Sequence, residues 1–273
     1  MLGHVNNVTY LNYLREARVD FFAALGRTID VDDLGDGIRI TRNQVVFAAP
    51  LLFRPKPITI ELWTSDIGEG SFALNYEVFD ETPNGRVVYL RVRAELQPWV
   101  VATGEARMLT GEERGQLSHY LDDPIEFSPV PSVLEPSKLP ASYDLSVRLS
   151  DLDIYRRVSD VIYFEYFQEA RVAYLYDLAT RSEGASALVI ARTDITYVQP
   201  VLLRREPYLI RSGVAKVGNT SFTIVAQILD GDTVAATAQV VLVGFDPKRQ
   251  AAAPLTESQR AVLLAEYEAV ASA

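Results

Sequence analysis

The chain contains one sequence pattern twice, and this repeat limits the possible folds more than any other feature. When the sequence is shifted by 153 positions, residues 3–22 align with residues 156–175, and the run Glu-Ala-Arg-Val at 16–19 falls on an identical run at 169–172. Farther along the best shift is 150, and near each end it is 146, which indicates loops of different lengths. Because the order of the matches never changes, the sequence predicts two similar domains.

A proline-rich segment separates the two copies. Five prolines lie between residues 123 and 142, and proline removes a backbone donor and favours extended chain. We therefore expect a first domain over residues 1–122, a linker over 123–142 and a second domain over 143–273.

Each copy predicts one long helix followed by several strands. The helices begin near Asn7 and Asp160, whose side chains can cap a helix, and apolar residues then recur at helical spacing. Runs rich in β-branched and aromatic residues follow, and the short turns between them imply antiparallel neighbours. The expected strands cover residues 39–47, 58–65, 72–79 and 87–99 in the first copy, and 186–198, 208–217, 222–229 and 234–245 in the second. The fold class is therefore α+β, with each helix packed on an antiparallel sheet and the two copies paired within the chain.

The second copy has one segment that the first copy lacks. Residues 143–149 alternate apolar and polar and predict a strand before Asp153. A shift of Asp153 by 153 positions gives position zero, so the matching acid of the first copy would lie immediately before Met1. We interpret Met1 as an internal methionine or a wrongly assigned start. The alternative is a natural chain that has lost this strand and its acid.

Composition argues against several functions. The formal charge of −10 repels nucleic acid, and the chain has no cysteine, which fits a cytoplasmic protein. No signal peptide and no apolar run long enough to span a membrane is present. The sequence also has no Gly-x-Ser-x-Gly motif, no phosphate-binding loop and no cluster with metal-ligand spacing, so we expect no metal and no organic cofactor.

The start of the first copy carries a specific signature. Residues 3–7 read Gly-His-Val-Asn-Asn, and Tyr10, Tyr13 and Glu16-Ala17-Arg18 follow. This pattern resembles the signature of hotdog-fold thioesterases of the 4-hydroxybenzoyl-CoA thioesterase type, in which an aspartate precedes the glycine by three residues. The resemblance covers both copies and implies a tandem, or double, hotdog. It further implies that the aspartate acts as general base or nucleophile, and that a backbone amide at the helix start polarises the thioester carbonyl.

Carried over to this chain, the resemblance assigns the carboxylate role to Asp153. The helix-start amide falls at Asp160 in the second copy and at Asn7 in the first. The second copy has Arg156 in place of Gly3, and loss of the glycine could keep the backbone from approaching a substrate. Either the first copy was the catalytic half, or Asp153 alone carries turnover; Asp153 could also merely cap a turn.

Further candidates have two interpretations each. His4 is expected to position rather than to transfer protons, because the second copy has arginine there. Glu16 and Glu169 could orient water, or could be hydrogen-bonded acids at a subunit seam. The basic turns could hold the phosphates of coenzyme A or could be solvated. Three other residues could contact the substrate or could pack in the core. The basic turn residues are Arg54, Lys56, Arg204 and Arg205, and the three other candidates are Asn6, Tyr10 and Tyr163.

The leading functional hypothesis is hydrolysis of acyl-CoA thioesters to a free acid and coenzyme A. An acyl carrier protein thioester is a close variant. A non-catalytic acyl-CoA-binding protein also stays open, because one copy lacks its acid and the other has an altered loop. An enoyl-CoA hydratase is disfavoured, because it would need a histidine a few residues after Asp153, where the sequence has Arg157 and Val158. A homo-oligomer is a further open possibility.

Overall fold

The computed structural model describes residues 7–26, 36–51, 55–130, 134–184 and 186–272. The chain divides into two compact units, Met1–Phe127 and Ser128–Ala273, and each unit is described by itself. Within the described residues, no helix is long and apolar enough to cross a membrane.

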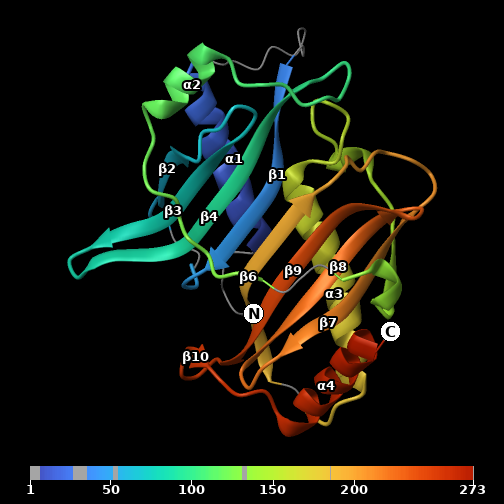
Figure 1. Ribbon diagram of the computed structural model, residues 1–273. Helices are drawn as coiled ribbons and strands as arrows, with labels where there is room; N and C mark the ends of the chain where they lie inside the picture. Colours follow the sequence, from blue (N-terminus) through green and yellow to red (C-terminus); the bar gives the residue numbers. More distant parts are fainter. Residues whose placement is uncertain (1–6, 27–35, 52–54, 131–133, 185, 273) are drawn as a thin grey trace. The chain divides into compact units, whose positions relative to one another are not determined.

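Unit 1 is a four-stranded antiparallel sheet with a long helix on one face (Figure 1). The strand order is β2-β3-β4-β1. The helix buries a stripe of apolar side chains at helical spacing, Val8, Leu11, Leu14 and Phe21, as the sequence pattern predicts. The elements are α1 (Asn7–Ala24), β1 (Asp36–Phe47), β2 (Thr59–Ser65), β3 (Phe72–Thr82), β4 (Gly85–Val100) and α2 (Gly111–Ser118).

Unit 2 repeats this plan and adds one strand at the sheet edge. Its strand order is β6-β9-β8-β7-β5, and a short strand, β10, pairs with β9. The helix α3 covers one face of the sheet, and α4 lies against β7 (Figure 1). The elements are the 3₁₀ turn Pro136–Lys138, β5 (Ala141–Leu145), the 3₁₀ turn Leu149–Asp151, α3 (Asp160–Thr180), β6 (Ala187–Tyr197), β7 (Tyr208–Val217), β8 (Ser221–Asp230), β9 (Thr233–Asp246), β10 (Ala251–Ala252) and α4 (Glu257–Ser272).

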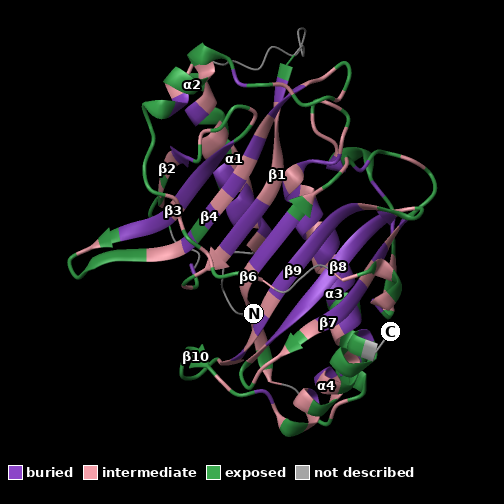
Figure 2. Cartoon of the chain, in the orientation of Figure 1, coloured by how far each residue is buried: buried purple, intermediate pink, exposed green. Residues whose placement is uncertain are grey.

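The core of unit 2 lies between α3, α4 and the sheet. Tyr174 and Leu178 from α3 pack with Phe222 and Ile224 from β8 and with Leu263 from α4. Figure 2 shows this burial along β8, β9 and α3. Burial of these apolar surfaces is the main free energy that holds the helices on the sheet.

The two units repeat each other down to single hydrogen bonds. The hydroxyl of Tyr10 accepts from the amide of Leu51 at 3.0 Å, and the hydroxyl of Tyr163 accepts from the amide of Val201 at 2.9 Å. The register of the sheet also shifts at the same place in both units, between residues 40 and 42 in β1 and between 190 and 192 in β6. The repeat in the sequence is therefore a repeat in the fold, a double hotdog of class α+β.

Two expectations about the elements were wrong. Each copy has a second helix, α2 or α4, where the sequence pattern had predicted only one helix per copy. The strand expected over residues 143–149 lies at 141–145 instead, because a 3₁₀ turn begins at Leu149. Asp151 closes that turn, accepting from the backbone amide of Arg148 at 2.8 Å.

Candidate active site

A tight loop in front of α3 contains the predicted catalytic residue of unit 2. Leu152 pairs with Val158 across the loop. The amide of Asp153 donates to the carbonyl of Arg157 at 2.7 Å, and the amide of Arg156 donates to the carbonyl of Asp153 at 3.0 Å. These bonds hold Asp153 in a defined position just before the helix.

The carboxylate of Asp153 is anchored through one oxygen. Its Oδ1 accepts from the amides of Tyr155 at 2.8 Å and Arg157 at 3.1 Å. Within the described residues we find no hydrogen bond to Oδ2. Burial raises the pKa of Asp153, and the two amides oppose this shift. The residue therefore does cap a turn, and it also keeps one oxygen available to accept a proton.

Arg156 adopts the backbone conformation that a glycine would take. Its φ of 59° lies in the left-handed region, which disfavours side chains with a Cβ. Arg156 aligns with Gly3 of the first copy, so the loop of the second copy keeps the glycine-like turn although the glycine is gone. The loop of the second copy was expected to differ from the family pattern. Its side chains do differ, but the backbone at Arg156 has the conformation that a glycine favours.

The first turn of α3 lies close enough to Asp153 to affect it. Asp160 is the first residue of the helix and is half-buried, and its carbonyl accepts from the hydroxyl of Tyr197 at 3.1 Å. After burial, the negative charge of Asp160 further raises the pKa of Asp153. Backbone amides at a helix start carry partial positive charge and have no partners within the helix. This end of α3 can therefore stabilise an anion beside Asp153.

A basic loop pairs with the loop that contains Asp153. Arg157 bridges to Leu202, and the amide of Val158 donates to the carbonyl of Val201 at 3.0 Å. Residues 201–207, between β6 and β7, are thereby held beside Asp153. This segment carries Arg204 and Arg205.

The two arginines of this loop have different surroundings. The guanidinium of Arg204 stacks 3.5 Å above the ring centroid of Tyr208 and pairs with Asp230, so it is committed to holding the loop. Arg205 is exposed, and we find no ion pair to it within the described part of the chain. Of these two arginines, Arg205 is therefore the one more available to an anionic ligand.

A buried acid that sequence reasoning did not single out lies next to the site. Asp151 accepts from the hydroxyl of Tyr166 at 2.6 Å, and its own carbonyl accepts from the amide of Ser159 at 2.9 Å. Burial raises the pKa of Tyr166, and the bond to Asp151 adds to this shift. Asp151 therefore ties the loop to α3. Its position in Asp-x-Asp just before the helix was the signal in the sequence.

The recurring helix glutamates differ between the units. Glu169 accepts from the hydroxyl of Tyr143 at 3.1 Å and pairs with Arg148 at 3.3 Å. Its side chain is 33% exposed, whereas that of Glu16 is 73% exposed and lies 3.9 Å from Arg15. The structure makes Glu169 a hydrogen-bonded acid between β5 and α3.

Among the other predicted residues, Tyr163 lies near Asp153: burial raises the pKa of its hydroxyl, and the charge of Asp153 adds to this rise. Tyr10 and Tyr163 are buried, and their hydroxyls are hydrogen bonded to backbone amides. Lys56 is exposed and lies 3.7 Å from the carboxylate of Asp80, and Asn7 begins α1. The predictions at Gly3, His4, Asn6 and Arg54 fall outside the described residues.

A long helix on an antiparallel sheet, present twice and with a carboxylate before one helix start, defines the double-hotdog class of thioesterases. The chain belongs to the thioesterase-like superfamily, whose family model matches residues 1–134 and 147–263. The protein YsmA of Bacillus subtilis strain 168 is 28% identical over 123 residues, which are 44% of this chain and 82% of that protein.

Solved structures agree with this fold over most of the chain. A predicted oleoyl thioesterase of Lactobacillus plantarum has a TM-score of 0.72 and 15% identity, covering 89% of this chain and 91% of that one. The 12:0-ACP thioesterase of Umbellularia californica has a TM-score of 0.69 and 15% identity, with the same coverages. An acyl-ACP thioesterase of Bacteroides thetaiotaomicron has a TM-score of 0.63 and 18% identity, covering 88% and 90%. At such low identity these similarities show the fold and not the substrate.

Proposed function

We propose that this chain hydrolyses acyl-CoA thioesters to a free acid and coenzyme A, with Asp153 as the catalytic carboxylate of unit 2. One observation carries the proposal. Asp153 is fixed through Oδ1 by two backbone amides, keeps Oδ2 unbound within the described residues, and has a raised pKa beside the start of a helix. A carboxylate in this state is a stronger base than a solvated one.

In the proposed reaction, Asp153 takes a proton from water as the water oxygen attacks the thioester carbonyl carbon. The carbonyl oxygen becomes negatively charged, and the first amides of α3, near Asp160, stabilise it. The intermediate then collapses, the carbon–sulfur bond breaks, and the proton on Asp153 passes to the leaving thiolate. A direct attack by Oδ2 on the carbonyl, followed by hydrolysis of the anhydride, would use the same geometry.

The basic loop supports a substrate with phosphate groups. The protein has a net charge of −10, so a phosphate would be repelled from most of its surface. Arg205 is exposed on the loop that pairs with the Asp153 loop, and arginine binds phosphate through charge-assisted hydrogen bonds. We assign Arg205 to the phosphates of coenzyme A.

An acyl carrier protein thioester is the second candidate, because two of the solved structures with this fold are acyl-ACP thioesterases. The prosthetic arm of a carrier protein also carries a phosphate. The two substrates differ in size and in protein contacts, so a direct comparison of kcat/KM separates them.

The test is a thiol-release assay on acyl-CoA and acyl carrier protein panels. We expect Asp153→Asn to lower kcat by at least about 100-fold, the usual contribution of general base catalysis. The matched control is Asp232→Asn, an exposed acid in the turn between β8 and β9, which should leave the rate unchanged. Arg205→Ala should raise KM for acyl-CoA with little change in kcat.

Two outcomes would contradict the proposal. Equal rates for the wild-type chain and Asp153→Asn would remove Asp153 from catalysis. Acyl-CoA binding by calorimetry with no thiol release from any acyl group would instead favour the non-catalytic binding protein.

A further inference from the structure

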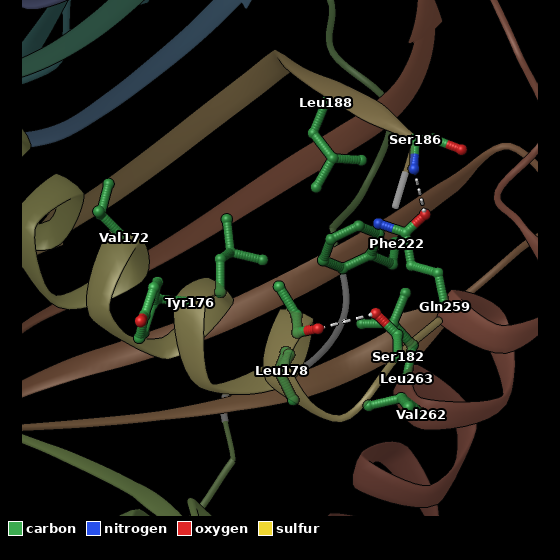
Figure 3. Close-up of a pocket in the computed structure, with 12 residues that line it drawn as sticks. Val172, Tyr176, Leu178, Ser182, Ser186, Leu188, Phe222, Gln259, Val262 and Leu263 are labelled. Carbon is green, nitrogen blue, oxygen red and sulfur yellow. Dashed lines mark hydrogen bonds between the residues drawn. The ribbon is translucent and has the colours of Figure 1, made fainter. Parts of the chain in front are cut away.

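Unit 2 has an apolar cavity of about 360 Å³ between the second half of α3, the sheet and α4. Leu175 of α3 lines this cavity. Tyr176 also lines it from α3, Leu188 from β6, Phe222 from β8 and Val262 from α4 (Figure 3). None of the residues that line it is charged. Leu175 follows Asp160 by fifteen residues, about 22 Å along a helix that rises 1.5 Å per residue, so this cavity is separate from the start of α3.

The matching position in unit 1 holds a larger side chain. Phe22 aligns with Leu175, and Phe72 aligns with Phe222. The rings of Phe22 and Phe72 meet edge to face, with centroids 6.4 Å apart. In unit 2 the smaller leucine leaves room above Phe222, and the cavity lies there.

The residues at the end of the cavity near α4 are neutral, whereas the residues at the matching positions of unit 1 are charged. In unit 1, Arg107 pairs with Asp36 at 2.9 Å and with Glu113 at 2.7 Å, and these three side chains form a charged cluster. The acids align with Ser186 and Gln259 in unit 2.

The arginine of that cluster is also replaced, because Arg107 aligns with Ala253. In unit 2 the amide of Ser186 donates to the side-chain oxygen of Gln259 at 3.3 Å (Figure 3). All three charges of the cluster are therefore absent at the matching positions. The cavity has become apolar along its walls and neutral but polar at one end. There the hydroxyl of Ser182 donates to the carbonyl of Ala179 at 3.2 Å, and the hydroxyl of Ser186 donates to the carbonyl of Pro254 at 3.1 Å. This leaves the side-chain NH₂ of Gln259, for which we find no acceptor within the described residues.

We propose that this cavity binds the hydrocarbon chain of a free fatty acid, with the carboxyl end at the polar mouth, beside the side-chain amide of Gln259. The volume lies at the lower end of the range for ligand pockets, about 300–1,000 Å³, which suits one slim alkyl chain and not a nucleotide. Apolar walls without a charged group favour such a chain. The choice of a fatty acid rests on the proposed function, of which it is the product; binding itself requires no turnover.

Binding of saturated fatty acids of increasing length to the full chain tests the proposal, by calorimetry or by displacement of a fluorescent fatty acid. Each added methylene should raise the affinity about four-fold, from the free energy of burying one CH₂, until the cavity is full. Leu175→Phe, which restores the side chain of unit 1, should weaken binding at least ten-fold. Leu121→Phe makes the same change at an exposed site in unit 1 and should bind like the wild type.

Two further variants keep the outcome decisive. Ser186→Asp restores one charge of the unit 1 cluster and should also weaken binding at least ten-fold, so the proposal stays testable if Leu175→Phe folds poorly. Asp153→Asn should bind fatty acids normally even if it abolishes hydrolysis, which separates this proposal from the proposed function.

Contrary results are equally clear. Unchanged fatty acid binding in both Leu175→Phe and Ser186→Asp would overturn the proposal. So would a result in which free fatty acids do not bind and Leu175→Phe instead shifts the chain-length preference of hydrolysis, because the cavity would then hold the acyl chain of the substrate.

Discussion

The left-handed backbone of Arg156 gives the sharpest test of how the repeat has diverged. With φ at 59°, a residue with a Cβ is strained by roughly 1–2 kcal/mol relative to glycine. Glycine also gives the unfolded chain more freedom, which costs about 0.5–1 kcal/mol. We therefore expect Arg156→Gly to exceed Arg156→Ala in stability by roughly 0.5–1 kcal/mol, since both variants remove the same charge and only one removes the Cβ.

Urea unfolding followed by circular dichroism measures this difference. For a unit of this size the melting temperature should also rise by about 2–4 °C per kcal/mol. If Arg156→Gly is no more stable than Arg156→Ala, the turn is not strained and the argument is wrong. Because the backbone of this loop already has the glycine conformation, hydrolysis by Arg156→Gly should stay close to that of the wild type.

The other predictions concern the acids around the site. Burial raises the pKa of Asp153 above the ordinary value of 3.8, so kcat/KM should fall on acidification with an apparent pKa above that value, and pH profiles of Asp153→Asn should lack this limb. Asp151→Ala should cost about 2–3 kcal/mol in urea unfolding, because the buried hydroxyl of Tyr166 loses its acceptor. Glu169→Gln should cost about 1 kcal/mol, whereas Glu16→Gln, its exposed counterpart, should stay within about 0.5 kcal/mol of the wild type; equal effects in this pair would contradict the assigned contacts.

Most of the fold could be predicted from the sequence, because the repeat and the strand patterns are strong local signals. β7 lies where expected, over residues 208–217, and α3 begins at Asp160 as expected. The prediction that Asp160 caps this helix was wrong, because Ser159 is the N-cap residue and makes no side-chain capping bond. These elements are long and regular, so their hydrophobic periodicity dominates over the details of packing.

The second helix of each copy was missed although the sequence has a signal for it. Thr110 and Glu113 form a capping box, in which each side chain bonds to the backbone of the other residue. Thr256 caps α4 through one such bond, its hydroxyl accepting from the amide of Gln259 at 3.1 Å. A threonine three residues before Glu or Gln marks a helix start. α2 has only 8 residues, which is too short for apolar periodicity to indicate a helix.

The candidate site could be predicted only in part. Asp153 and the start of α3 were found because they align with a family pattern. The partners of Asp153 are backbone amides, and no residue-type pattern reveals which amides a turn will present. The pairing of Arg157 with Leu202 joins residues 45 positions apart, and such a contact depends on the packing of the sheet rather than on local sequence.

If unit 2 binds ligand as proposed, the two copies of this fold have taken different tasks. In unit 1 the positions that match the cavity of unit 2 hold the packed rings of Phe22 and Phe72 and the charged cluster of Arg107. Both favour a rigid interior. Unit 2 replaces these groups with smaller neutral ones and keeps the Asp153 loop in its glycine-like form. A copy under selection for stability alone would be expected to fill the cavity near Leu175, because an unfilled apolar space costs free energy. Within the described residues, the larger side chain at this position lies in unit 1 and the open space beside Leu175 lies in unit 2, which is the pattern expected if unit 2 receives ligand there.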